Sequence, residues 1–378
     1  MESVVIAGFA RSPFHFANKG ALARVRPDDL AAQVIRGLIG KTGVDAADIE
    51  DLIVGCAFPE GEQGLNVARL IGLLADLPIS VAGMTVNRFC GSSMSAIQIA
   101  MGQIAIGAGE VFICAGVESM SRVPMMGFNP LPNPVLAKRS AAYISMGETA
   151  ENVAGQYQIG RKEQEALALE SQKRAAAARE AGKFADEIVP IETGTGLVGE
   201  DGTIRPGTTA EELAGLKPAF DAGGTVTAGT SSPLTDGASA VLVTTQEYAR
   251  KHNLPILARI TSVSVSGCAP ETMGLGPIIA SRKAMERAGI TAADLDIVEL
   301  NEAFASQALA CIQDLGLDPA KVNIDGGAIA LGHPLGATGA RIVGKAAALL
   351  KREGGRRALA TQCIGGGQGI ATVLEAVE

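Results

Sequence analysis

The chain contains no tryptophan and only three tyrosines and three histidines, so few side chains are available for proton transfer near neutral pH. Basic residues are also in the minority, because 32 lysines and arginines face 40 aspartates and glutamates and give a formal net charge of −8. A nucleic-acid binder needs a basic face for phosphate contacts, so this charge argues against that class of function. It leaves room for a small anionic ligand in a local basic pocket.

Long uninterrupted apolar runs are missing as well. The apolar stretch over residues 99–117 is broken by Gln103, Glu110 and several glycines, so it predicts no membrane span. The N-terminal sequence MESVVIAGFARSPF begins with an acidic residue and has only a short apolar run, unlike a signal peptide or a basic transit peptide. The last residues, LEAVE, carry no address signal. We therefore expect a cytoplasmic protein.

The cysteines include no CxxC pair. A long cytosolic chain of this kind disfavours disulfides and gives little support to a zinc site, so we expect no bound metal. A free cysteine is usually a small buried apolar residue, and this interpretation suits four of the six: Cys56, Cys114, Cys268 and Cys311. Cys90 and Cys363 differ, because loops rich in glycine or serine follow them.

The 378 residues suffice for more than one domain, and 47 glycines scattered through apolar segments indicate a layered α/β protein with tight strand-to-helix turns. Apolar residues at helical spacing, or in one all-apolar run, predict helices over residues 28–41, 66–77, 93–109, 161–182, 278–289 and 340–354. Short apolar runs predict strands over residues 3–10, 51–58, 84–89, 110–119, 237–245, 258–267, 296–305 (leading into a helix), 321–329, 357–364 and 367–377.

Residues 121–233 interrupt this alternation with clustered prolines, a charged helix and a glycine-rich patch, and we interpret them as an inserted, loop-rich lobe. Alternatively, its charged residues only form a surface that faces solvent. The lobe separates an N-terminal half (1–120, completed by 234–255) from a C-terminal half (256–378). Each half carries an apolar strand, a Gly/Ser loop with one reactive side chain and an apolar helix, which suggests two similar halves that face each other.

The stretch NRFCGSSMSA places Cys90 where an apolar strand turns into a helix. A thiol is a nucleophile only as the thiolate, and the N–H groups and positive dipole of a helix N-terminus favour that form. Gly91 allows a close approach of the backbone, and Ser92 or Ser93 can cap the helix. Cys90 is therefore a candidate nucleophile, and a plain tight turn is the alternative.

The loop NIDGGAIALGHPLGATG holds His333, the only histidine set among glycines, whereas His15 and His252 lie outside such loops. Histidine titrates near neutrality and can accept a proton from a thiol. So many glycines cost stability unless the backbone must approach a ligand. His333 is therefore a candidate base, and a surface histidine in a flexible turn is the alternative.

Two further strand ends carry candidate groups. In TQCIGGGQG, Cys363 ends a strand before three glycines, whose N–H groups can form an oxyanion hole. In LNEAFA, Asn301 and Glu302 follow another strand, where ligand-facing groups gather in open α/β sheets. A nucleophile, a base, a second thiol and oxyanion donors on one chain form a much sharper pattern than any one of them alone.

At these residues the sequence resembles the thiolase family of acyl-CoA C-acetyltransferases, in seven stretches that cover nearly the full length: NRFCGSSMSAI, SMGETAENVA, VTAGTSSPLTDGA, MGLGPIIASRKAMERAG, NEAFA, NIDGGAIALGHPLGATGAR and CIGGGQG. The resemblance implies a five-layered α/β/α/β/α fold of two similar halves, with the inserted loop lobe over a coenzyme A site. It implies no metal or redox cofactor, because coenzyme A and acyl-CoA are the substrates. The sequence has no metal-ligand cluster and no nucleotide fingerprint, which fits that expectation.

Carried onto this chain, the family pattern makes Cys90 the acylated nucleophile, His333 the base that activates it, and Cys363 the acid/base at carbon. It assigns Asn301 to a water beside His333, and the water and imidazole would bind one thioester oxygen. The N–H groups of Cys90 and Gly365 would form a second oxyanion hole. Four residues are implied to contact coenzyme A: Ser232 at the pantetheine arm, Arg205 on the adenine, Phe304 and Met146.

Two departures bear on the substrate. Short-chain biosynthetic thiolases often have a histidine where this chain has Ser145, and the stretch between Met120 and Met146 is short for a tetrameric member. Both features, with GTSSP, resemble degradative 3-ketoacyl-CoA thiolases of β-oxidation, and acetoacetyl-CoA thiolase is the alternative. We expect a homodimer that docks with a β-oxidation multienzyme subunit. Three side chains are expected to wall an acyl tunnel, or only to pack the lobe: Met125, Met126 and Phe128.

Two other classes of protein share the expected fold. A decarboxylating condensing enzyme of the ketoacyl synthase type uses two histidines, and neither His15 nor His252 stands in a suitable glycine-rich loop. A non-catalytic lipid-binding or scaffold protein would be expected to lose a reactive residue. This chain keeps all four: Cys90, Asn301, His333 and Cys363.

Overall fold

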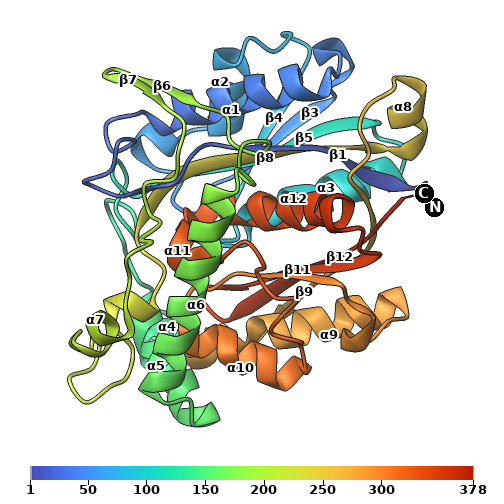
Figure 1. The fold of residues 1–378 in the computed structure, drawn as a ribbon. Helices are drawn as coiled ribbons and strands as arrows, with labels where there is room; N and C mark the ends of the chain where they lie inside the picture. The colour runs from blue at the N-terminus through green and yellow to red at the C-terminus, as the bar shows by residue number, and fades with distance from the viewer. Residues whose placement is uncertain (1, 378) are drawn as a thin grey trace.

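The computed structural model describes residues 2–377, which form five stacked layers of helices and strands (Figure 1). The middle layer contains helices α3 (Ser92–Ala105) and α12 (Leu335–Glu353), with a layer of strands on either side. Four helices cover the two outer faces: α1 (Pro27–Thr42) and α2 (Val67–Leu74) on one, α9 (Gly276–Ala288) and α10 (Ala305–Leu315) on the other. The expected fold class is confirmed.

One ten-stranded sheet supplies both strand layers. The first layer has the order β4-β3-β5-β8-β1, with β2 beside β8, and the second has the order β9-β12-β11-β10. A short antiparallel ladder between β1 and β9 joins them, where Val5 pairs with Arg259 and Ile6 with Ala258. The strands are β1 Val4–Arg11, β2 His15–Phe16, β3 Asp51–Gly55, β4 Ala82–Val86, β5 Val111–Ser119, β8 Thr235–Thr245, β9 Ala258–Gly267, β10 Ile297–Leu300, β11 Arg357–Ile364 and β12 Gln368–Glu375.

Helix α12 lies at the centre of the molecule, and 15 of its 19 residues are buried. Small residues let it approach its neighbours closely. A Cβ atom on Gly339 would lie 2.3 Å from the backbone nitrogen of Met94 in α3, so only glycine allows this packing of the two helices. The all-apolar segment that the sequence places in the middle of the protein is α3, and this expectation is confirmed.

One predicted strand, over residues 321–329, is wrong. Val322 forms an isolated parallel bridge with Val298 of β10, and the following residues form turns that lead into the short helix α11 (Ala328–Leu331). The reason is the side chain of Asn323, which accepts a hydrogen bond from the N–H of Leu300 and donates one to its carbonyl oxygen. The backbone N–H and carbonyl oxygen of Leu300 are therefore bonded to an amide side chain and not to the backbone of a neighbouring strand. Asn323 itself has a left-handed φ of 48°, which a strand does not allow.

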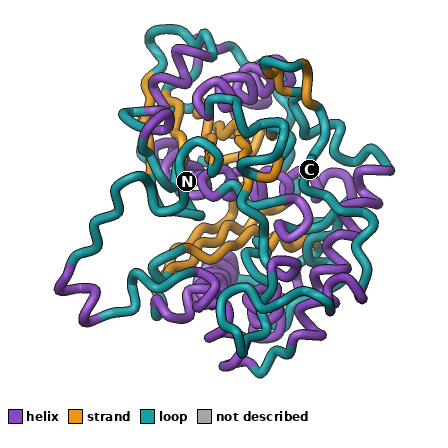
Figure 2. The backbone as a smooth tube through the Cα atoms, turned by 90° about the vertical axis from the view of Figure 1, so that its left-hand side faces the viewer, coloured by secondary structure: helices purple, strands orange, loops and turns teal. Residues whose placement is uncertain are grey.

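Residues 121–233 contain most of the long loops, which run down the left side of Figure 1 and face the viewer in Figure 2. The helix expected over residues 161–182 is present as α6, which packs against α10 and α11. The division of the chain at residues 120, 233 and 255 stays a prediction. The other helices and strands of this part of the chain are α4 Pro134–Arg139, α5 Met146–Tyr157, α6 Arg161–Glu180, β6 Ile191–Thr193, β7 Gly196–Val198 and α7 Ala210–Ala214, and α8 spans Gln246–Lys251.

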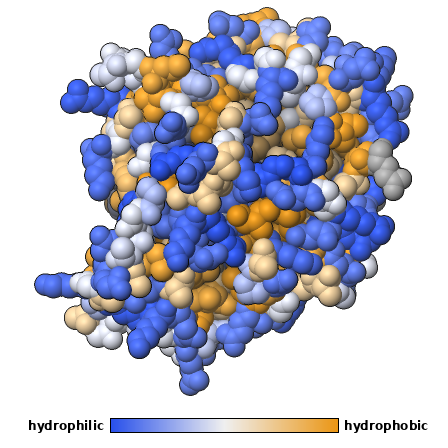
Figure 3. Space-filling view, in the orientation of Figure 1, coloured by the Kyte–Doolittle hydropathy of each residue, from blue (hydrophilic) through white to orange (hydrophobic). Residues whose placement is uncertain are grey.

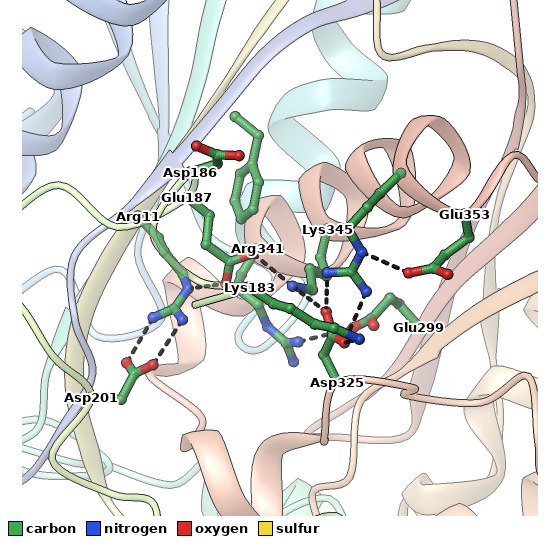
Figure 4. A network of polar contacts seen from close by, with 12 residues as sticks. Arg11, Lys183, Asp186, Glu187, Asp201, Glu299, Asp325, Arg341, Lys345 and Glu353 are labelled. Carbon is green, nitrogen blue, oxygen red and sulfur yellow. Dashed lines mark hydrogen bonds and ion pairs between the residues drawn. The ribbon is translucent and has the colours of Figure 1, made fainter. Parts of the chain in front are cut away.

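A buried ion network ties this part of the chain to both halves (Figure 4). Arg11 of β1 lies 2.8 Å from Glu187 and 2.7 Å from Asp201. Lys345 of α12 lies 2.8 Å from the same Glu187 and 2.8 Å from Asp325. Because each of these charges has an opposite charge at hydrogen-bond distance, their burial is compensated in the folded state.

No helix within residues 2–377 combines the length and the apolar character that a bilayer crossing requires. On the face drawn in Figure 3, hydrophilic residues surround patches of apolar ones.

Candidate active site

Cys90 lies in a tight turn between β4 and α3, as the sequence predicts. The preceding residue, Phe89, has a φ of 42°, which is unusual for a residue with a side chain. Ser92 holds the turn, because its hydroxyl accepts a hydrogen bond from the N–H of Arg88 and donates one to the carbonyl oxygen of Phe89. This strained turn presents the thiol of Cys90 at the start of α3.

The thiol of Cys90 is protonated at rest. Burial raises its pKa to about 11, while its own N–H and that of Gly365 hydrogen-bond to the sulfur and act in the opposite direction. The nearby carboxylate of Glu118 raises the pKa further. A base is therefore needed to make the nucleophile.

His333, between α11 and α12, has the properties of that base. Its Nδ1 lies 2.6 Å from the hydroxyl of Thr338, and this hydroxyl donates its own hydrogen to the carbonyl oxygen of Pro334. The Thr338 oxygen therefore accepts from Nδ1–H, which leaves the lone pair on Nε2. Burial lowers the pKa of His333 to about 3, and the charge of Arg341 acts in the same direction. The imidazole is thus neutral near pH 7 and able to accept a proton.

Asn301 follows β10 and faces that lone pair. Its Nδ2 lies 3.3 Å from Nε2 of His333. Its Oδ1 is buried and has no hydrogen-bond partner among the described residues. An unpartnered buried carbonyl oxygen is costly, so this atom is suited to hold a water or a ligand donor beside His333.

Cys363, near the end of β11, is the second thiol of the site. Its side chain is buried among apolar groups that include Met273 and Phe304. Burial raises its pKa well above the usual value, and a thiolate at Cys90 would raise it further. A thiol that keeps its proton at neutral pH can serve as an acid.

The loop after Cys363 closes over the nucleophile. The side chain of Gln362 donates a hydrogen bond to the carbonyl oxygen of Cys90, and the N–H of Gly365 points at its sulfur. Gly365 in turn lies near Met146, whose Sδ would be 3.6 Å from a Cβ at that position. The structure thus brings together the glycine-rich loops of both halves.

Three of the four residues expected to contact coenzyme A lie next to the cluster around Cys363. Met146 and Phe304 pack in the cluster that holds Cys363, and Ser232 hydrogen-bonds through its N–H and its hydroxyl to the carbonyl oxygen of Ala303. Arg205 lies apart from them. Its N–H donates to Gln172 of α6, and its Nε is buried without a partner among the described residues.

The other two histidines lie elsewhere. His15 contacts the carbonyl oxygen of Glu200, and His252 stacks on Tyr248 at a ring distance of 4.1 Å. The site therefore contains one histidine and two thiols. Within residues 2–377 no group of three or more His, Cys, Asp and Glu side chains is arranged to hold a metal ion.

Two family models match the chain from end to end. Residues 4–247 match the N-terminal domain of thiolase, and residues 254–376 match the C-terminal domain of thiolase. The chain belongs to the thiolase family.

Named relatives of this thiolase cover its whole length. It is 47% identical over 388 residues to the 3-ketoacyl-CoA thiolase of Bacillus subtilis strain 168, with 99% of each chain covered. It is 49% identical over 391 residues to the 3-ketoacyl-CoA thiolase of Shewanella denitrificans, with 100% of each covered.

Solved structures agree with this assignment. The crystal structure of human mitochondrial 3-ketoacyl-CoA thiolase matches with a TM-score of 0.92 at 38% identity, covering 100% of this thiolase and 99% of that chain. The same human enzyme in complex with CoA matches with the same score and identity, covering 100% and 98%.

The sequence did not single out Thr338, although it lies in the quoted GATG. Its position could have indicated this contact, because Thr338 follows His333 by five residues and lies in the first turn of the next helix.

Proposed function

We propose that this thiolase is an acyltransferase that cleaves 3-ketoacyl-CoA with coenzyme A, giving acetyl-CoA and an acyl-CoA two carbons shorter, through an acyl intermediate on Cys90. The observation that carries the proposal is the neutral imidazole of His333, with Nδ1 held by Thr338 and Nε2 facing Asn301. No resident cofactor is part of the proposal, because coenzyme A and acyl-CoA are the substrates.

In the first half-reaction, Nε2 of His333 accepts the proton of Cys90, and the thiolate attacks the 3-keto carbon. The C2–C3 bond breaks, its electron pair stays on C2 as the enolate of acetyl-CoA, and Cys363 protonates C2. The enolate oxygen is the thioester oxygen that a water on Asn301 and the imidazole would bind. The N–H groups of Cys90 and Gly365 would stabilise the oxyanion on the carbon that becomes bonded to sulfur.

In the second half-reaction, the thiol of coenzyme A attacks the acyl group on Cys90 and gives its proton to the Cys363 thiolate. The Cys90 thiolate leaves and recovers its proton from His333. Every proton returns to its starting group, and the reverse sequence is a Claisen condensation. Ser232, Phe304, Met146 and Arg205 are proposed to contact coenzyme A, and the first three adjoin the cluster around Cys363.

The cellular context is part of the proposal. The 3-ketoacyl-CoA substrate suits fatty-acid β-oxidation in the cytoplasm. A homodimer is proposed through the β4 edge of the sheet, because β4 is one of the two terminal strands and is partly exposed. A β-oxidation multienzyme subunit is proposed as a docking partner.

The alternative function is acetoacetyl-CoA thiolysis, and Ser145 bears on it. Its hydroxyl accepts from the N–H of Glu148 and caps α5, so a helix start occupies the position of the family histidine. The expected tunnel wall is not formed within the single chain, where Met125, Met126 and Phe128 are 39%, 49% and 60% exposed. The proposal for longer chains therefore rests on Ser145 and on the relatives' names.

The test combines mass spectrometry with steady-state kinetics. Brief exposure to acetyl-CoA should add one acetyl group, which maps to Cys90 and is absent from the Cys90→Ser variant. Thiolysis should have a higher kcat/KM for an eight-carbon than for a four-carbon 3-ketoacyl-CoA. Label on Cys363 would overturn the assignment of the nucleophile, and equal or better turnover of the four-carbon substrate would favour the alternative.

A further inference from the structure

Glu118, the penultimate residue of β5, is a buried carboxylate that touches both halves of the catalytic site. It is 1% exposed. Oε2 accepts hydrogen bonds from the N–H of Ala57 at 2.8 Å and from the N–H of Gly336 at 2.9 Å. Oε1 accepts from the side-chain amide of Gln63 at 2.8 Å and from the N–H of Phe58 at 3.3 Å. Ala57 and Phe58 precede Glu118 in the N-terminal part of the chain, whereas Gly336 belongs to α12, 218 residues after Glu118.

The two segments that Glu118 joins adjoin the nucleophile and the base. Ala57, Phe58 and Leu335 belong to the apolar cluster that also contains Cys90. Leu335 is the first residue of α12, and His333 precedes it by two positions. The carboxylate therefore bridges the wall of the Cys90 pocket and the helix start that carries His333.

The contact at α12 replaces an ordinary helix cap. Pro334 stands at the N-cap position and offers no side-chain hydrogen bond, so the first N–H groups of the helix need another partner. A negative charge at this end is favoured by the helix dipole. The fit is close, because a Cβ on Gly336 would lie 2.6 Å from the carbonyl oxygen of Val117 and 2.7 Å from that of Gly55.

The charge of Glu118 also reaches the nucleophile. Burial raises the pKa of Glu118, but its contacts are donors, and those from Ala57, Gly336 and Gln63 favour the carboxylate. The carboxylate in turn contributes to the raised pKa of Cys90. A residue kept for activation of the thiol would have the opposite charge, so activation is not what this carboxylate provides.

We infer that Glu118 is a positioning residue, whose carboxylate sets the spacing and orientation of the Cys90 pocket and the His333 helix start by holding Ala57 and Gly336 on one oxygen. The inference rests on the proposed roles of Cys90 and His333. Misplacement of reacting groups by about 1 Å costs on the order of a hundredfold in rate. A bridge that positions the Cys90 pocket against the His333 helix start can therefore outweigh the unfavourable rise in the pKa of Cys90.

Two variants separate position from charge. Glu118→Asp keeps the charge but shortens the side chain, so its carboxylate no longer reaches both N–H groups. Glu118→Gln keeps the length but removes the charge and turns an amide NH2 toward N–H donors. Glu187→Gln is the matched control, because Glu187 is also buried and paired but belongs to the ion network of Figure 4.

Three readouts are needed for each variant: thermal unfolding, kcat and KM for thiolysis, and the rate of iodoacetamide inactivation at pH 8. The ionisable side chains that interact with Glu118 or Cys90 are each other, Cys56, whose buried thiol lies 3.7 Å from Oε1 of Glu118, and Cys363 on β11, while Arg88 donates to Ser95. Removal of one negative charge lowers the pKa of Cys90 and so increases the thiolate fraction at pH 8.

We expect Glu118→Asp to lower kcat by about 10- to 100-fold with KM for coenzyme A little changed and the alkylation rate near that of wild type. Glu118→Gln should lower kcat at least as much, yet be alkylated about three- to tenfold faster. Glu187→Gln should lose thermal stability without either change.

The inference is overturned if Glu118→Asp keeps a wild-type kcat, or if Glu118→Gln resembles Glu187→Gln in all three readouts. Should Glu118→Gln fail to fold, the kcat of Glu118→Asp decides alone. If alkylation does not inactivate the wild-type protein, the proposed role of Cys90 is wrong. If alkylation inactivates it but the Glu118 variants keep the wild-type kcat, only the inference about Glu118 is wrong.

Discussion

The hydroxyl of Thr338 lies 2.6 Å from Nδ1 of His333 and determines which imidazole nitrogen is the base. The carbonyl oxygen of Pro334 can accept the hydroxyl hydrogen, and the donor amide nitrogen of Asn301 faces Nε2. Both contacts favour the tautomer with its proton on Nδ1. The remaining nitrogen, Nε2, faces Asn301.

Replacing Thr338 tests this relationship. Thr338→Val keeps the shape and removes the acceptor, so the imidazole loses its preferred tautomer. We expect kcat for thiolysis to fall by about 10- to 100-fold, since a well-placed general base contributes about that much or more. Thr338→Ser keeps the hydroxyl and should stay within about threefold of wild type in steady-state assays. A Thr338→Val protein as active as Thr338→Ser would show that the hydroxyl does not set the tautomer.

Cys363 is predicted to transfer a proton at carbon and not to carry the acyl group. Its buried thiol keeps its proton at rest, as an acid toward the acetyl-CoA enolate requires. Cys363→Ala should still take an acetyl group on Cys90 but should exchange the methyl protons of acetyl-CoA with deuterated water at least about a hundredfold more slowly. Mass spectrometry follows the first property and NMR the second. Rapid exchange in this variant would remove Cys363 from the proton-transfer step.

The sequence predicted the local turns that carry the candidate residues better than the distant contacts that hold these turns in place. The NRFCGSS turn, the HPLG loop and the CIGGGQG loop are local patterns, and local backbone geometry is encoded within a few residues. Glu118 could not be found in this way, because its partner Gly336 is 218 residues away and only the fold brings them together. The strand expected at residues 321–329 failed for a similar reason, since the side chain of Asn323 pairs with Leu300 across two segments.

His333 should make the protein sensitive to acid. Its pKa is lowered from 6.5 to about 3 by burial and by Arg341, so the unfolded chain binds a proton in this window and the folded protein does not. The stability that depends on a neutral His333 is therefore present above pH 6.5 and lost as pH falls toward 3. Glu299, whose pKa burial raises to about 7, has the opposite effect between pH 4.5 and 7.

A variant isolates the contribution of His333. The free energy of unfolding of His333→Asn should fall less steeply between pH 6 and pH 4 than that of the wild type, because Glu299 is present in both. Urea unfolding at a series of pH values measures the two slopes. Parallel slopes would mean that His333 titrates with a nearly normal pKa in the folded protein.

Lys345 is predicted to be a costly charge to remove from the ion network, because it bridges Glu187 and Asp325 at 2.8 Å each. Although burial opposes it, the hydrogen bonds and charges of Arg352 and Lys345 hold the pKa of Asp325 at about 2. Lys345→Met keeps most of the side-chain volume but leaves two buried carboxylates short of a partner. Breaking a buried pair in this way costs about 3–5 kcal/mol in the free energy of unfolding.

The matched control is Arg356→Met, which removes a surface pair with Glu375 at 3.8 Å from a side chain that is 74% exposed. It should cost less than about 1 kcal/mol. The pH dependence gives a second check. The stability that comes from the lowered pKa of Asp325 is present above its ordinary value of 3.8 and lost as pH falls toward 2. Because Lys345→Met moves this pKa back toward 3.8, the difference in unfolding free energy between wild type and variant should shrink below pH 4. Equal losses for the two variants at pH 7, or a gap that persists into acid, would mean that the network adds nothing beyond a surface ion pair.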